Sequence, residues 1–257
     1  MVQVGDRPAQ VRETFRQTHA RLSGAQKGAR GAPAYSRFVN RPAGRLLATA
    51  AYGMGLTPNG VTAISAVWTF SAIAVLALAR PSWGAGIAVA VLLLVGYAFD
   101  SADGQLARLR GGGSLVGEWL DHMVDSVKTA SLHLALVIGL YRAQVVPEAW
   151  LLVPLGYSAV STVHFFAMIL NDQLRHRGGA AMRSAAGGTR APVFRSLLVA
   201  PTDYGVLCLV FVLYGATDVF VAVYSLLFAA TAAFLAAACV SWFREMSALG
   251  RPDTSTG

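Results

Sequence analysis

Residues 83–108 read WGAGIAVAVLLLVGYAFDSADGQLAR, and this stretch decides the fold. It carries no charged side chain before Asp100, and it is long enough to supply the ~20 residues with which a helix crosses a bilayer. The rest of the chain is similar in character, because 55% of all residues are hydrophobic, only 13% are charged and the mean hydropathy is +0.52. A soluble domain of 257 residues needs more charge to cover its surface. The sequence therefore predicts an integral membrane protein.

Apolar segments of this kind recur along the chain and favour helices, because lipid offers no partners to the backbone of an open strand. The first begins at Thr57, which can cap a helix, and continues with Pro58, which suits a first helical turn. We expect an all-α integral membrane protein with six transmembrane helices, preceded by an amphipathic interfacial helix over residues 35–52, for which a linker is the alternative. The six predicted spans are residues 57–79, 83–108, 114–141, 149–174, 201–216 and 218–244, of which the fifth is the shortest.

These segments make one predicted membrane domain, residues 34–246, between a flexible basic extension at residues 1–33 and a flexible tail at residues 247–257. The net charge is +8, and the basic residues gather before position 46 and between Arg175 and Arg195. Basic loops beside membrane spans normally stay in the cytoplasm, and six crossings place both ends there, with only Arg80 and Arg142 at outer loops. No nucleic-acid recognition motif accompanies the charge, so we expect no nucleic-acid partner. The richness in Ala, Arg and Gly suggests a bacterium, and hence its cell membrane.

Two predicted spans break the rule that membrane helices avoid ionisable residues. Asp100 and Asp103 share one face of their helix, and Asp121 and Asp125 share one face of the next. A charge inside a membrane span is costly and marks a functional site by default. The glycine turn at residues 111–113 makes the two helices antiparallel neighbours, so the four carboxylates can converge near the cytoplasmic surface. Such a cluster suits Mg²⁺ or Mn²⁺, and two ions about 4 Å apart are the usual arrangement.

The same residues resemble a known family. The signature of the CDP-alcohol phosphotransferases requires eight residues at fixed spacing, and this sequence matches every position. The matching residues are Asp100, Asp103, Gly104, Ala107, Arg108, Gly117, Asp121 and Asp125. The resemblance extends to the six-helix plan, to the preceding amphipathic helix and to the residues that open the first span.

The resemblance implies a function and a role for each matching residue. It implies metal ligation by Asp100, Asp103 and Asp121, with Asp125 also near the metals and acting as general base. Further residues are expected to bind the CDP donor, namely Gly104, Ala107, Arg108, Ser114, Gly117 and, more weakly, Asn59 and Thr62. The implied reaction moves a phosphatidyl or related group from a donor such as CDP-diacylglycerol to an alcohol and releases CMP. Membrane lipids and a second copy of the chain, as a homodimer, are the other expected partners.

The acceptor alcohol is less well defined by the sequence. Lys128, Arg195 and Asp203 are candidates to bind it, although Lys128 is equally suited to be a counter-charge for the aspartates and Asp203 to cap a helix. Inositol phosphate or another polyol is the expected acceptor, but residues 200–205 lack the pair of basic side chains that a phosphorylated acceptor requires. A transporter with an acidic relay and a non-catalytic membrane scaffold are the competing functions.

Overall fold

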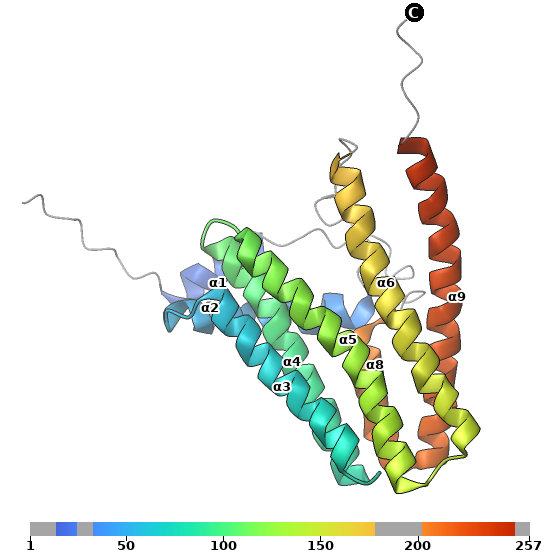
Figure 1. Cartoon of the computed structure of the whole chain (residues 1–257). Coiled ribbons are helices and arrows are strands. Elements are labelled where there is room, and N and C mark those ends of the chain that lie inside the picture. The colour runs from blue at the N-terminus through green and yellow to red at the C-terminus, as the bar shows by residue number, and fades with distance from the viewer. Residues whose placement is uncertain (1–13, 25–32, 178–201, 250–257) are drawn as a thin grey trace, which may run out of the picture.

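A computed structural model of the chain describes residues 14–24, 33–177 and 202–249, and these ranges are helical without a strand (Figure 1). Within these ranges, five helices are long and apolar enough to cross a membrane, which confirms a multi-pass membrane protein of the all-α class. They are α3 (Pro58–Leu78), α4 (Trp83–Leu109), α5 (Leu115–Ala143), α6 (Leu152–Arg177, with the preceding 3-10 turn η2, Glu148–Leu151) and α9 (Thr217–Leu249).

Side-chain caps set the first residues of three long helices. The hydroxyls of Thr57, Ser82 and Ser114 each accept a hydrogen bond from a backbone N–H three residues later, at 3.0–3.1 Å. Each cap satisfies one of the N–H groups that a helix leaves free at its start. The predicted start at Thr57 is therefore confirmed. Ser114, which was predicted to contact the CDP donor, is also the cap of α5.

The fifth predicted span is shorter than residues 201–216 suggested. It consists of α8 (Tyr204–Val210) and the 3-10 helix η4 (Phe211–Gly215), and it is not one of the five helices long enough to cross a membrane. Its buried side chains include Cys208, Phe211 and Tyr214, so it packs inside the bundle. The apolar run of residues 201–216 is short, and the helix is shorter still because Asp203 caps it only at Tyr204 and the chain turns into α9 directly after Gly215.

The predicted interfacial helix is present as a π-helical turn η1 (Ser36–Asn40) followed by α2 (Arg41–Gly53). It crosses α4, as the blue segment in Figure 1 shows, and Gly44 packs there against Ser101, the residue after Asp100. Phe38, Val39 and Leu46 expose about half of their surface, whereas the side facing the bundle is buried. This two-sided character fits a helix at the membrane surface.

A further helix, α1 (Phe15–Gly24), lies inside the range 1–33 that the sequence analysis assigned to an extension. Leu22 is fully buried, and Arg21 lies over the ring of Tyr52 at 5.6 Å. α1 therefore packs against α2. Its short polar sequence carries no apolar stripe that would have predicted it.

The main hydrophobic core of the bundle lies between α3, α4, α5, η4 and α9, away from the end of the bundle that carries the aspartates. Gly139 allows two backbones to approach closely, because a Cβ atom there would lie 1.9 Å from the carbonyl oxygen of Leu76. The largest fully buried side chains are aromatic, namely Tyr214, Tyr224, Phe211 and Phe220. This packing holds α4 beside α3 and α5, and so fixes how the acidic faces of α4 and α5 meet.

Candidate active site

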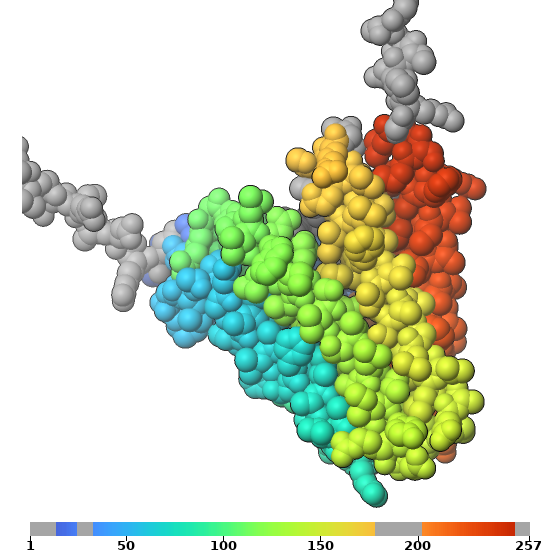
Figure 2. Space-filling model, in the orientation of Figure 1, coloured from blue at the N-terminus to red at the C-terminus, as the bar shows by residue number. Residues whose placement is uncertain are grey.

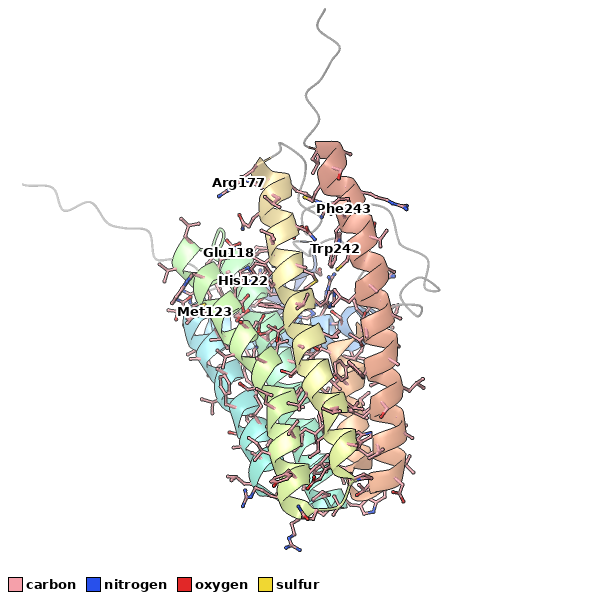
Figure 3. All side chains as sticks on the ribbon, turned by 45° about the vertical axis from the view of Figure 1, so that its right-hand side comes forward. Glu118, His122, Met123, Arg177, Trp242 and Phe243 are labelled. Carbon is pink, nitrogen blue, oxygen red and sulfur yellow. The ribbon has the colours of Figure 1, made fainter. Side chains whose placement is uncertain are left out.

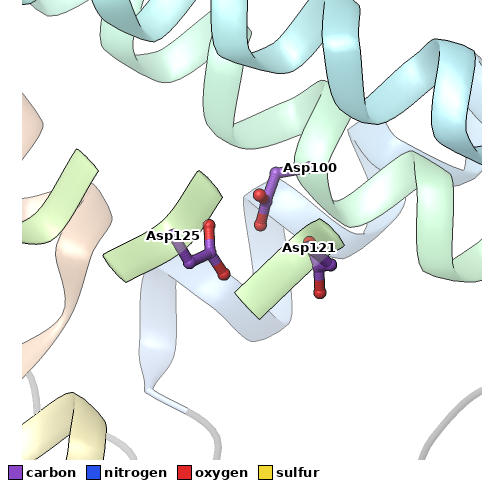
Figure 4. Close-up of side chains that lie close together, drawn as sticks. All are labelled: Asp100, Asp121 and Asp125. Atoms are coloured by element: carbon purple, nitrogen blue, oxygen red, sulfur yellow. The ribbon is translucent and has the colours of Figure 1, made fainter. Parts of the chain in front are cut away.

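Three of the four predicted metal-binding carboxylates come together. Asp100 of α4 and Asp121 and Asp125 of α5 each place one oxygen within 4.8 Å of the others (Figure 4). All three side chains are partly buried. Carboxylate oxygens are the ligands that hard divalent cations prefer, so this group of residues fits Mg²⁺ or Mn²⁺.

Asp103 lies one turn further along α4 and is held by other partners. Its Oδ2 atom accepts a hydrogen bond of 2.6 Å from the Thr62 hydroxyl, and its Oδ1 atom accepts one of 2.5 Å from the backbone N–H of Gly104. Only 6% of Asp103 is exposed. Thr62 was predicted as a weaker contact of the CDP donor. In the structure it hydrogen-bonds Asp103, which is one of the eight signature residues.

Lys128 joins the acidic faces of the two helices. Its Nζ atom lies 2.7 Å from Oδ1 of Asp100 and 2.6 Å from Oδ1 of Asp125. The side chain is 9% exposed, so the ion pairs are shielded from water. Of the two roles that the sequence left open for Lys128, the geometry supports that of a counter-charge.

A cavity of about 180 Å³ opens beside the carboxylates. One wall carries negative charge and another carries positive charge, since the cavity is lined by Arg41, Asp100, Ser101, Asp103, Gly104, Gln105, Arg108 and Asp121. Gly104 and Arg108 were predicted as donor contacts and lie here as expected. Arg41, Ser101 and Gln105 were not predicted. The family signature gives no indication of Arg41, because this residue lies outside the signature, on α2.

Apart from Ala107 near the end of α4, the remaining residues predicted to bind the CDP donor lie at the starts of α3 and α5. A Cβ atom on Gly117 would lie 3.1 Å from both the Asn59 amide oxygen and the Ser114 hydroxyl, so the three residues are neighbours. They do not line the 180 Å³ cavity, and neither does Ala107. Their role toward the donor stays a prediction.

Asp203 caps α8 and ties it to the N-terminal part of the chain. Its carboxylate accepts hydrogen bonds from the backbone N–H groups of Tyr35 at 2.7 Å, Ser36 at 3.3 Å and Gly205 at 3.1 Å. Burial raises the pKa of Asp203, while these three donors act in the opposite direction. The geometry supports the capping alternative for Asp203. Arg195, the third acceptor candidate, lies outside the described residues.

A second cavity, of about 210 Å³, lies between α5, α6, α8 and α9. Its polar lining includes Thr129, His133, Ser161, His164 and Asp203. The ring nitrogens of His133 lie 2.6 Å from the Tyr224 hydroxyl and 3.2 Å from the Ser161 hydroxyl, so this histidine has polar partners on both sides. On the face shown in Figure 2, the surface is hollowed between the first half of α5 and the last half of α6.

The ends of the helices around this hollow carry aromatic and charged side chains. Figure 3 shows Glu118, His122 and Met123 near the start of α5, with Arg177 at the end of α6 and Trp242 and Phe243 on α9. Trp242 stacks on His164, with ring centroids 6.1 Å apart. Arg175 is 3% exposed and pairs with Glu245, so α6 and α9 are joined beside the hollow.

The family model that matches the chain agrees with the signature. The model of the CDP-alcohol phosphatidyltransferase family matches residues 55–243. Among solved structures, the chain is similar to phosphatidylinositol phosphate synthase (PgsA1) of Mycobacterium tuberculosis in complex with manganese and citrate. The two share 22% sequence identity over 77% of this chain and 88% of that chain, with a TM-score of 0.41. No curated protein matches the chain.

Proposed function

The chain belongs to the CDP-alcohol phosphatidyltransferase family, and on this premise we propose that it uses a divalent metal to transfer a phosphatidyl or related group from CDP-diacylglycerol or a similar donor to an alcohol. The observation that carries the proposal is the meeting of Asp100, Asp121 and Asp125 beside a cavity with two arginines. Membership of an enzyme family favours this reading over a transporter or a scaffold.

The carboxylates suit the role of metal ligands. Asp100, Asp121 and Asp125 would hold Mg²⁺ or Mn²⁺, and two ions are proposed, with Asp103 lining the same cavity. When bound, such ions grip phosphate oxygens and offset the charge that develops during phosphoryl transfer. The hydrogen bond from Thr62 holds the Asp103 carboxylate in one orientation, which reduces the cost of assembling the site.

The donor is proposed to occupy the 180 Å³ cavity. Arg108 presents a guanidinium, which pairs well with phosphate oxygens, and Gly104 leaves open space because the nearest side-chain atom to a Cβ placed there, on Arg108, would be 3.6 Å away. Beyond the cavity, the proposed contacts for the rest of the donor are Ala107, Asn59, Ser114 and Gly117.

The proposed reaction is attack by the acceptor hydroxyl on the β-phosphorus of the donor. The new O–P bond forms as the bond from that phosphorus to the CMP oxygen breaks, and Asp125 accepts the hydroxyl proton. Lys128 holds the Asp125 carboxylate at 2.6 Å and limits its rotation. The carboxylate is therefore positioned by its own helix before the alcohol arrives.

The acceptor and the setting belong to the same proposal. Inositol phosphate or another polyol is the proposed acceptor. Arg195, Lys128 and Asp203 are the candidates to contact it, the last two in addition to their roles as counter-charge and helix cap. The active site is proposed to face the cytoplasm of a bacterial cell, within a homodimer.

A direct test measures CMP release by the purified protein from CDP-diacylglycerol with Mg²⁺, against a panel of alcohols that includes inositol phosphate, inositol, glycerol phosphate and serine. The expected result is metal-dependent CMP release with one acceptor class. Absence of CMP release with every alcohol would reject the proposal. Replacing inositol phosphate by inositol separates a phosphorylated acceptor from a neutral polyol.

A further inference from the structure

One cavity residue comes from outside the two long acidic helices. α4 and α5 provide every other residue that lines the 180 Å³ cavity, and Arg41 is the first residue of the interfacial helix α2. No signature residue lies on α2. The interfacial helix is thus part of the wall of the cavity and not only a membrane anchor.

The backbone of Arg41 is fixed against α4. The side-chain amide of Gln105 donates a hydrogen bond of 3.1 Å to the Arg41 carbonyl oxygen and another of 3.2 Å to the Ser101 hydroxyl. One turn later, Gly44 packs so closely that a Cβ atom there would lie 2.7 Å from Cβ of Ser101. These contacts hold Arg41 at the cavity independently of its charge.

The positive wall of the cavity holds two guanidinium groups. Arg41 and Arg108 are close enough for their charges to repel. Burial lowers the pKa of Arg41, while Tyr97 acts in the opposite direction. Asp103 offsets part of this repulsion at Arg108, and a bound anion that contacts both guanidinium groups would offset more of it. A diphosphate carries the charge and the oxygen atoms to contact both guanidinium groups at once.

We propose that Arg41 is a donor-binding residue that grips the diphosphate of the CDP-activated donor together with Arg108. This inference rests on the proposed function and extends its donor site to a second helix. Arg41 contributes to the cavity lining from α2, whereas Arg108 and Asp121 contribute from α4 and α5.

The test measures binding of CDP and of CMP to the purified full-length protein by calorimetry with Mg²⁺. Arg41→Gln is expected to weaken CDP binding by about tenfold or more, and CMP binding by less, because CMP has one phosphate fewer. Arg41→Lys keeps the charge but not the two-pronged donor set, so we expect about threefold or greater loss for CDP. Arg45→Gln is the matched control, since it removes the same charge one turn later on α2 and outside the cavity.

Each outcome decides one question. CDP affinity within about twofold of wild type in both Arg41 variants would overturn the inference, as would an equal loss in Arg45→Gln. Arg41→Lys keeps the test valid if the glutamine variant does not fold. Failure of the wild-type protein to bind CDP would instead reject the proposed function, so the two failures are distinguishable.

Discussion

The ammonium group of Lys128 lies 2.7 Å from Oδ1 of Asp100, and this ion pair joins α5 to α4. The same group contacts Asp125, so one buried cation neutralises part of the acidic cluster. Without a counter-charge, carboxylates this close repel strongly. Lys128 therefore supplies within the chain some of the charge compensation that a bound metal would also supply.

Replacing Lys128 by Met should make the fold depend on metal. Breaking a buried ion pair costs about 3–5 kcal/mol because it leaves an uncompensated charge. We expect a lower melting temperature than wild type in EDTA, and a larger rise on addition of Mg²⁺. Thermal unfolding in detergent measures both. Arg80→Met removes an exposed positive charge and serves as control. Equal Mg²⁺-induced shifts in wild type and Lys128→Met would contradict this account.

The proposed role of Asp125 as general base can be tested with a substitution that preserves the shape of its side chain. Asp125→Asn should reduce CMP release by about 10²- to 10⁴-fold, because the amide cannot accept the hydroxyl proton. CDP binding should weaken less than CMP release, since Asp125 does not line the donor cavity and two other carboxylates of the metal site are kept. Glu118→Gln removes an acid from the exposed surface of the same helix (Figure 3) and should keep wild-type activity. Wild-type turnover by Asp125→Asn would eliminate this residue as the base.

Thr62 should matter through Asp103. Thr62→Val removes the hydroxyl that donates to Asp103 Oδ2 at 2.6 Å and leaves a buried carboxylate short of one partner, at a cost of about 1–3 kcal/mol. Thr62→Ser keeps the hydroxyl. We expect the valine variant to melt at a lower temperature and to release CMP more slowly, with the serine variant close to wild type. The two variants behaving alike would show that the hydrogen bond contributes little.

Local features of the fold were predictable from sequence where they depend on neighbouring residues. Thr57 was identified as a cap, and the apolar runs gave the long helices, because capping and hydrophobic length are local properties. α8 was expected to belong to the shortest span, but not to be followed at once by the 3-10 helix η4. Its start depends on Asp203, whose carboxylate also binds the backbone of Tyr35 far away in the sequence.

The candidate site likewise has residues that the sequence predicted and residues that it did not. The spacing of Asp121 and Asp125 placed them on one face, and the turn between helices predicted that Asp100 would meet them. Arg41 was assigned only to an amphipathic helix, since periodicity says which face is polar but not what that face touches. Its partner Gln105 on α4 becomes visible only when α2 is placed across that helix.

The crossing of α2 over α4 should be sensitive to a single methyl group. Gly44→Ala would place Cβ 2.7 Å from Ser101 Cβ and 2.9 Å from the Gln105 amide nitrogen, so the helices must separate. Overpacking of this kind costs about 1–3 kcal/mol and would displace the start of α2 from the donor cavity.

Gly53→Ala, at the end of the same helix, meets nothing within 4 Å and is the matched control. Thermal unfolding and CDP binding should both weaken in Gly44→Ala and stay unchanged or improve in Gly53→Ala, because alanine favours a helix over glycine. Equal behaviour of the two variants would mean that α2 can shift on α4 without cost, and that its close packing does not position the donor site.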